Sequence, residues 1–582
     1  MRNPLSLTLH GLTTAVCASL FALPTTAQID EEMAAAIRQA GLEESQVMDI
    51  LDELTNGIGH RLTGSDNFTR ACEWAADEFR EMGLSNVQLE KWDTWPIVWN
   101  RGQWMGRVLG PEPMELQVAT EAYVNGTRGR QRGPAIRTPR SQEELAEVSD
   151  QLDGAWLVGP LPSPRGEFFA DLLEQTYGRI LGFAYGSTAS GRRGAPADYP
   201  NRMRVFSSAT MRGRVPTFDT PPEESTRIMV RRDQMDRILE MVDAGQSVEL
   251  EFDVRNRWRA EPIDLHNVIA EIPGTEKPDE VVVICGHLDS WHQASGTTDN
   301  GTGTASTMET ARILMAVGAQ PKRTIRFCLW GGEEQGLLGS AKHTTIRRQE
   351  LDKISAVYNH DTGTNWAAGL TVTPGMREML EPVFAPIMEL TPPDVDHEGP
   401  VFRFRETESF GGRGGGSDHA SFLGKGVPGL SWSLTGRSDY FGYTWHTQWD
   451  TYDVAIPEYM RHNATVFAMA ALGTANLPEM LPREGIGRAR GSDAKPVIER
   501  ILGMELGGEG NLDVTSVADG GTAARWGLKA GDRLHSVGET RIDSLGRLRL
   551  GLRAIQQADE GSRSGTLTVR REEELVVLKI SF

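Results

Sequence analysis

The stretch Val281-Val-Val-Ile-Cys-Gly-His-Leu-Asp-Ser290 places an imidazole and a carboxylate shortly after four β-branched residues. A short apolar run of this kind is typical of a strand that is buried on both faces. The run Asn267 to Ile272 before it also reads as a strand, and Gly303 to Val317 after it has helical spacing. Strands that alternate with helices in this way indicate an α/β sheet with helices on both faces.

The same alternation extends along the chain on both sides of this stretch. Further strands are expected at Thr324 to Trp330 and Ile354 to Asn359, and further helices at Gly339 to Arg348, Glu378 to Leu390 and Tyr459 to Ala475. Near the N-terminus, helical spacing covers Glu31 to Gly41, Ser45 to Leu54 and Asn67 to Met82. We therefore predict one mixed-sheet catalytic domain made from residues 28–104 and 259–476.

Two other regions differ in composition from this domain. Residues 105–258 are rich in Gly, Pro and Arg and carry short apolar runs, which predicts a β-rich inserted domain with long loops. Residues 477–496 carry repeated Pro and Gly and are interpreted as a linker. The last segment, 497–582, is expected to be a small β-rich domain, with a helix at Leu545 to Ala558.

The N-terminus is typical of an export signal. Arg2 supplies a positive charge, an apolar run reaches Leu23, and Ala27 is a small residue at the expected cleavage position. The alternative is a retained membrane anchor, but the run is short and interrupted by polar residues. We expect residues 1–27 to be a signal peptide and the mature chain to be secreted or periplasmic, without stable membrane insertion.

Composition excludes some partners. The 582 residues carry a formal net charge of −20, whereas a nucleic-acid binder needs a basic surface. Three cysteines remain after cleavage, and an odd number leaves at least one thiol unpaired. Cys285 and Cys328 each lie in a strand-like run, so buried free thiols are expected there.

Side chains that can bind metals follow several of the predicted strands. Asp299 lies in Thr297-Thr-Asp-Asn-Gly-Thr-Gly303, where on its own it is more typical of a helix cap. Glu333 and Glu334 follow a strand side by side, which is unfavourable unless a cation compensates them. Asp361 follows the next strand, and His446 lies in an aromatic-rich loop.

Together these residues satisfy the ligand count of a two-zinc site. Zinc takes His nitrogen and carboxylate oxygen, and a pair of zinc ions needs one bridging carboxylate. Asp299 can bridge, with His287 and Asp361 on one metal and Glu334 and His446 on the other. Glu333 is then left to act as general base. Asp289 could hold the second nitrogen of His287 or lie against another part of the site.

Other hydrolase and nucleotide-binding signatures are absent from the sequence. The chain has no Gly-x-Ser-x-Gly, no His-Glu-x-x-His, no Cys-x-x-Cys and no Gly-x-x-x-x-Gly-Lys-Ser/Thr. These absences argue against a serine hydrolase elbow and a phosphate-binding loop.

The motifs resemble, in chain order, those of the zinc peptidases of family M28, which include aminopeptidases and carboxypeptidase Q-like enzymes. The matching segments are Gly286 to Ser290, Asp299 to Gly303, Glu333 to Ser340, His360-Asp361 and His446-Thr447, with Gly416 to Ser421 resembling a segment near the pocket. The resemblance implies the fold of these exopeptidases, two zinc ions per chain on the five ligands above, and Glu333 as base. It places Asp289 behind the metal ligands, and it puts Asn300 where many relatives carry an Asp that is not a ligand.

The two flanking domains carry their own resemblances. Residues 105–258 resemble a protease-associated (PA) domain in position and texture, and residues 497–582 resemble a PDZ domain. The PDZ resemblance implies a C-terminal peptide as ligand, bound by a loop that begins at Ile501. A domain that only packs or oligomerises is the alternative.

The expected function is hydrolysis of peptide bonds at peptide termini or in dipeptides. The alternatives are a glutaminyl-cyclase-like acyltransferase with one zinc and a non-catalytic protein that binds peptides through the PDZ-like domain. Whether the N- or C-terminus is recognised stays open, as does a homodimer. Candidates for a substrate carboxylate are Arg405, Arg413 and Arg437, and candidates for an apolar pocket are Trp432, Tyr440, Tyr443 and Trp445, although surface ion pairs and core packing explain them as well.

Overall fold

The structure is a computed structural model of the whole chain. It describes residues 29–163, 167–187, 199–206, 225–391, 393–394, 402–410, 415–487, 502–507, 512–538, 540–542, 547–548, 551–552, 555, 564–572 and 574–581. The predicted signal peptide, Arg413 and Ile501 lie outside these residues.

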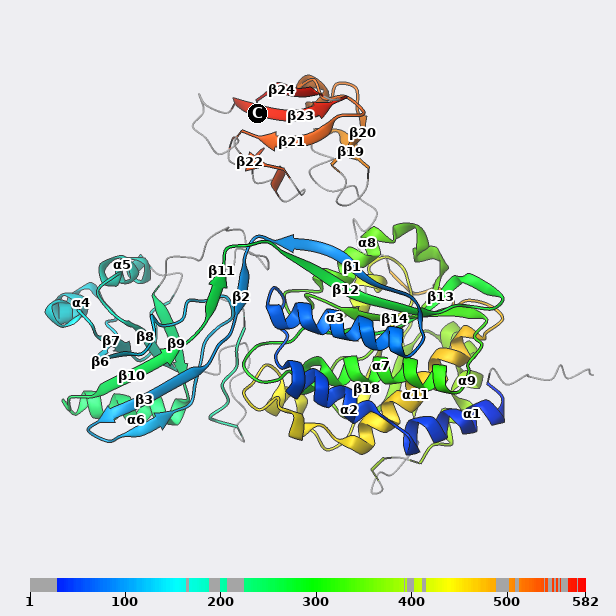
Figure 1. Cartoon of the computed structure of the whole chain (residues 1–582), viewed down its shortest axis with the longest axis horizontal. Helices are drawn as coiled ribbons and strands as arrows, with labels where there is room; N and C mark the ends of the chain where they lie inside the picture. The colour runs from blue at the N-terminus through cyan, green and yellow to red at the C-terminus, as the bar shows by residue number, and fades with distance from the viewer. Residues whose placement is uncertain are drawn as a thin grey trace, which may run out of the picture.

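The sheet built from residues on both sides of the inserted region is mixed, as the sequence predicts, and helices lie along it (Figure 1). It has eight strands. In spatial order its strands are β1 (Ser85–Trp95), β12 (Ile263–Ile272), β14 (Arg323–Trp330), β13 (Lys277–His287), β15 (Ile354–Asn359), β18 (Gly429–Thr435), β16 (Trp366–Val372) and β17 (Arg403–Glu406). The four central strands, β14, β13, β15 and β18, are mutually parallel. Their carboxyl ends therefore meet at one edge of the sheet, where ligands collect in α/β folds.

Strand β13 shows why helices cover both faces of this sheet. Val282 and Ile284 pack into the large core that contains α7 and α11, whereas Val281, Val283 and Cys285 pack into a second core with Phe422. Successive side chains of a strand point to opposite faces, so a continuous apolar run needs cover on both. The quoted stretch thus specifies a central strand.

The helices of this domain begin and end close to the expected positions. They are α1 (Glu31–Arg38), α2 (Val47–Asp52), α3 (Asp66–Glu81), α7 (Thr302–Ala316), α8 (Leu338–Ile346), α9 (Pro374–Met388), α10 (His419–Leu423) and α11 (Pro457–Ala475). Short π or 3-10 turns complete the domain: η1 (Gln39–Glu43), η2 (Glu53–Ile58), η4 (Thr297–Gly301), η5 (Arg348–Lys353), η6 (Tyr440–Thr444) and η7 (Tyr452–Val454). The start of α3 has a local cause, because the Ser65 hydroxyl accepts a hydrogen bond from the Phe68 N–H at 3.2 Å.

The inserted region contains a second eight-stranded sheet, and it also contains helices that its composition did not predict. In spatial order the strands are β4 (Met114–Leu116), β3 (Trp104–Gly110), β10 (Glu249–Val254), β6 (Gln131–Arg137), β7 (Trp156–Val158), β8 (Gly182–Gly186), β9 (Thr226–Val230) and β5 (Val118–Ala119). The helices are α4 (Gln142–Val148), α5 (Glu167–Thr176) and α6 (Arg232–Asp243), with the turn η3 (Ser149–Gln151). Strands β2 (Val98–Asn100) and β11 (Arg257–Arg259) pair where the chain enters and leaves this region (Figure 1).

The C-terminal region has its own apolar core. Its elements are β19 (Met504–Leu506), β20 (Val514–Val517), α13 (Thr522–Arg525), β21 (Arg533–Val537), β22 (Thr540–Arg541), β23 (Ser564–Arg571) and β24 (Glu574–Ser581). The helix expected at Leu545 to Ala558 lies mostly outside the described residues. The first part of the expected linker is packed: Leu477 and Leu481 are buried in the large apolar core that also contains α7 and α11.

Two further expectations concern cysteines and membranes. Cys72, Cys285 and Cys328 are buried free thiols, as predicted for the last two. In the part of the chain that the structure describes, none of the helices has the length and apolar character needed to cross a bilayer.

Candidate metal centre

The predicted ligands gather at the carboxyl edge of the central strands. His287 is the last residue of β13, Glu333 and Glu334 follow β14, and Asp361 follows β15. Because β13 pairs in parallel with both β14 and β15, these strand ends are neighbours in space. Asp299 reaches the same place from η4, in front of α7.

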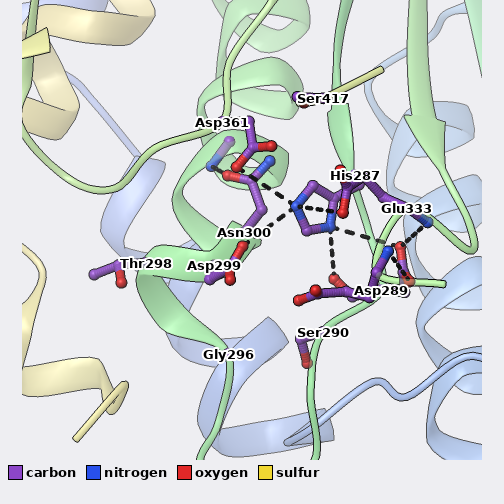
Figure 2. A network of polar contacts seen from close by, with 12 residues as sticks. His287, Asp289, Ser290, Gly296, Thr298, Asp299, Asn300, Glu333, Asp361 and Ser417 are labelled. Atoms are coloured by element: carbon purple, nitrogen blue, oxygen red, sulfur yellow. Dashed lines mark hydrogen bonds and ion pairs between the residues drawn. The ribbon is translucent and has the colours of Figure 1, made fainter. Parts of the chain in front are cut away.

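His287, Asp299 and Asp361 form the first of two groups that could hold a metal ion, and their ligand atoms all lie within 4.8 Å of one another. His287 Nε2 lies 3.4 Å from Asp299 Oδ1 and 3.6 Å from Asp361 Oδ1. Figure 2 shows Asp299 and Asp361 turned toward the same edge of the His287 ring.

The second group consists of Asp299, Glu334 and His446. His446 Nε2 lies 3.1 Å from Asp299 Oδ2 and 3.1 Å from Glu334 Oε2. Asp299 therefore belongs to both groups and presents a different carboxylate oxygen to each histidine. Glu333 belongs to neither group, although its Oε2 lies 4.0 Å from His287 Nε2.

The residues present fit a pair of zinc ions. Nε2 of His287, Oδ2 of Asp299 and Oε1 of Glu334 are buried and have no hydrogen-bond partner among the described residues. Buried polar atoms without partners are costly unless something else binds them. Imidazole nitrogen and carboxylate oxygen are the donors that zinc takes, so a cation at each group would satisfy these atoms.

The electrostatics of the site also favour a bound cation. Burial raises the pKa of Glu333 well above its ordinary value, and Asp361 and Asp418 add to the rise while His287 opposes it. Burial and the charge of Asp299 raise the pKa of Glu334 to about 7. So many buried carboxylates repel one another, and a shared cation compensates them.

Asp289 lies behind the two glutamates and contacts their backbone. Its carboxylate accepts hydrogen bonds from the Glu333 N–H at 3.1 Å, the Glu334 N–H at 3.3 Å and the Thr63 hydroxyl at 2.8 Å. The second nitrogen of His287 donates to the backbone carbonyl of Asp289 at 2.9 Å, and the Asp289 carboxylate lies farther from it, at 3.6 Å. These contacts indicate that Asp289 positions the backbone of the two glutamates.

We expect Asp289→Ala to lower activity or metal affinity by about 10- to 100-fold, because it leaves the two buried N–H groups that place Glu333 and Glu334 without an acceptor. Asp289→Asn keeps one acceptor oxygen and should lose less. Steady-state kinetics and elemental analysis of the purified variants measure both effects. Equal losses for the Ala and Asn variants would contradict this role.

Asn300 directly follows Asp299, the residue shared by both groups. Its side-chain amide donates to the His360 carbonyl at 2.8 Å, and its side-chain oxygen accepts from the Gly303 N–H at 3.1 Å. Both polar atoms are thus engaged in holding the start of α7. This agrees with the expectation that Asn300 is not a ligand.

Two buried residues that the motif analysis missed also hold the site. Asp450 accepts hydrogen bonds from the backbone N–H of Thr298 at 2.6 Å and of Asp299 at 3.2 Å, so it fixes the shared ligand. Arg61 is fully buried and donates to backbone carbonyls in the segment after β13, at Leu288, Ser295 and Gly296. The only hints in the sequence were an Asp four residues after His446 and an Arg within a loop of turn-forming residues.

The segment Gly416 to Ser421 lies close behind the site. The Ser417 hydroxyl accepts a hydrogen bond from the Asn359 side chain at 2.8 Å, and Figure 2 shows Ser417 beyond Asp361. Asp418 is fully buried, which raises its pKa to about 7. This segment adds a buried carboxyl group beside the site but belongs to neither metal-binding group.

The residues suggested for substrate recognition lie in different environments. Arg437 pairs with Glu458 at 2.7 Å, Arg405 is exposed on β17, and Trp432 stacks in the core against Phe467. Tyr440 is buried, and Tyr443 stacks on Trp449. A small cavity at the second group is instead lined by Trp291, Gln293, Ala294, Gly296, Asp299, Glu334, His446, Thr447 and Asp450.

Comparison with known proteins finds relatives of the region that carries this site. Residues 267–471 match the sequence profile of Peptidase family M28. Carboxypeptidase Q of Mus musculus is 26% identical over 445 residues, which cover 76% of this chain and 88% of that protein. Carboxypeptidase Q of Homo sapiens is 26% identical over 486 residues, 81% of this chain and 95% of that protein. The crystal structure of a peptidase M28 precursor from Shewanella amazonensis SB2B superposes with a TM-score of 0.54, at 24% identity over 78% of this chain and 98% of that chain, and so shares the fold.

Proposed function

From the match of residues 267–471 to peptidase family M28, we propose that the chain is an exported zinc exopeptidase that hydrolyses peptide bonds at peptide termini or in dipeptides. The observation that carries the proposal is the position of Asp299, whose two oxygens face two different histidines, His287 and His446. A carboxylate shared in this way is what a two-metal hydrolytic site requires. The name of the mammalian relatives, carboxypeptidase Q, supports action at a peptide end.

In this proposal each group holds one zinc ion. His287, Asp299 and Asp361 hold the first, and Asp299, Glu334 and His446 hold the second. When bound, the two ions would lower the pKa of a water molecule and polarise the scissile carbonyl. Asp289, Asp450 and Arg61 keep the ligands in place through the backbone contacts described above.

Glu333 is the proposed general base. It belongs to neither metal-binding group. Its side chain is 11% exposed, more than the side chain of any of the five predicted ligands. A carboxylate that lies beside the metal positions without being a ligand can accept a proton from water. Glu333 accepts a proton from the attacking water at a carboxylate oxygen and then donates it to the leaving amine.

The first experiment measures zinc in the purified mature chain by elemental analysis, before and after treatment with a chelator. We expect two zinc ions per chain, loss of peptidase activity on chelation, and recovery when zinc is returned. One zinc with release of ammonia from N-terminal Gln peptides would instead identify a cyclase. No zinc at all would indicate a binding protein.

A substrate panel on the same samples determines which terminus is recognised. Free dipeptides, N-blocked dipeptides and C-blocked dipeptides are compared at equal concentration. Cleavage of N-blocked but not C-blocked substrates identifies a carboxypeptidase, and the reverse pattern identifies an aminopeptidase. Cleavage of free dipeptides alone identifies a dipeptidase.

A further inference from the structure

The two candidate histidine ligands are oriented in different ways. His287 has its second ring nitrogen fixed by the Asp289 carbonyl at 2.9 Å. The second ring nitrogen of His446, Nδ1, is buried and finds no hydrogen-bond partner among the residues that the structure describes. Metal-bound histidines normally use this nitrogen to fix the ring. Something other than a hydrogen bond must therefore hold the His446 ring.

Three aromatic side chains surround the His446 ring. The centroid of Trp445 lies 4.3 Å from that of His446, Phe206 lies at 5.1 Å with its ring at 76°, and Trp291 lies at 5.7 Å. Trp445 and Trp291 belong to the catalytic domain. Phe206 belongs to the inserted region, in the segment 199–206 between β8 and β9. One of the three aromatic rings around His446 thus comes from the inserted region.

The backbone of the same inserted segment runs along the His446 loop. The Val205 N–H donates to the His446 carbonyl at 3.1 Å, and Arg204 forms an antiparallel bridge with Thr447. Met203 N–H donates to the Gln448 side chain at 2.9 Å, and the Arg202 guanidinium donates to the Gly442 carbonyl at 2.9 Å.

His446 itself has a φ of 60°. A residue other than glycine is uncommon in this left-handed region and persists there only when its surroundings hold it. The contact from Val205 fixes the carbonyl of this residue, and Phe206 packs on its ring. The inserted segment therefore holds both the backbone and the side chain of one ligand.

We propose that the inserted region is a positioning element for His446, and that through Phe206 and Val205 it sets the zinc affinity of the Asp299–Glu334–His446 position alone. The inference rests on the proposed function, since it requires two zinc positions. Among the described residues, the Phe206 ring contacts those of Trp291, Trp445 and His446, and no ring contact joins it to His287, so the other position should not depend on it. Phe206 is a positioning residue because it acts through His446.

The test compares zinc titrations of the full chain, stripped of metal, by calorimetry. Phe206→Ala should raise the Kd of one of the two zinc equivalents by about 10-fold or more and leave the other within about twofold, as for the loss of a group that orients a ligand. Phe206→Tyr keeps the ring and should restore the wild-type value. Tyr177→Ala, an exposed aromatic elsewhere in the inserted region, is the control and should change neither.

A second variant tests the backbone contact independently. Val205→Pro removes the N–H that donates to His446 and should weaken the same single equivalent. Two zinc equivalents with unchanged affinities in Phe206→Ala and Val205→Pro would overturn the inference and leave the proposed function intact. Equal weakening of both equivalents would also overturn it. A wild-type chain that binds no zinc would overturn the proposed function itself.

Discussion

Replacing Glu333 with Gln is expected to lower kcat by about 10³-fold while two zinc ions stay bound, because general base catalysis contributes on that order. The amide has nearly the same shape as the carboxylate but cannot accept a proton from water. Glu333 belongs to neither metal-binding group, so the residues that would hold the two ions do not change. Its backbone N–H, held by Asp289 at 3.1 Å, is also untouched.

The adjacent Glu334→Gln is the matched control for this variant. It makes the same chemical change one residue away, but Glu334 Oε2 lies 3.1 Å from His446 Nε2 within a metal-binding group. We expect Glu334→Gln to lose zinc and Glu333→Gln to keep it. Kinetics and elemental analysis on both proteins separate the roles. Full activity of Glu333→Gln would show that another group takes the proton.

Replacing Asp299 with Ala is expected to release both zinc ions and to lower kcat/KM by about 10³-fold or more, because several kcal/mol of metal-derived stabilisation are lost together. The reason is geometric, since Oδ1 of Asp299 faces His287 and Oδ2 faces His446. No other described residue belongs to both groups.

Single-group variants are the controls for Asp299. Asp361→Ala removes a ligand of the first group alone, and His446→Ala removes a ligand of the second group alone. Each should retain about one zinc per chain under conditions where Asp299→Ala retains none, as counted by elemental analysis after gel filtration. Retention of one zinc by Asp299→Ala would mean that the carboxylate does not bridge.

The parts of this protein that could be predicted from sequence are those with a local signal. The apolar run that ends at His287 specifies a strand covered on both faces, and its neighbours repeat the pattern, so strand ends and ligand candidates follow from periodicity and position. The inserted region was interpreted from its composition, which indicated strands. Helices α4, α5 and α6 were therefore missed, although α6 buries Met235, Ile238 and Met241 at helical spacing.

The positioning contacts could not be predicted from the sequence, for a different reason. Arg61, Asp450 and Phe206 each act on residues far away in the chain, through backbone hydrogen bonds or ring packing. Nothing in the neighbouring residues of Phe206 distinguishes it from any other partly exposed aromatic. Such contacts depend on how surfaces of separate regions fit together, which hydrophobic periodicity does not encode.

The sequence by itself determined which candidate ligands follow β13, β14 and β15, because side chains at the ends of parallel strands meet at one edge of the sheet. Only the tertiary structure decided how they act: that Asp299 presents one oxygen to each histidine, that Asp289 holds backbone amides, and that His446 is held by a segment of the inserted region. Ligand identity depends on chemistry that each residue carries alone. Ligand orientation depends on contacts between segments that only the folded chain brings together.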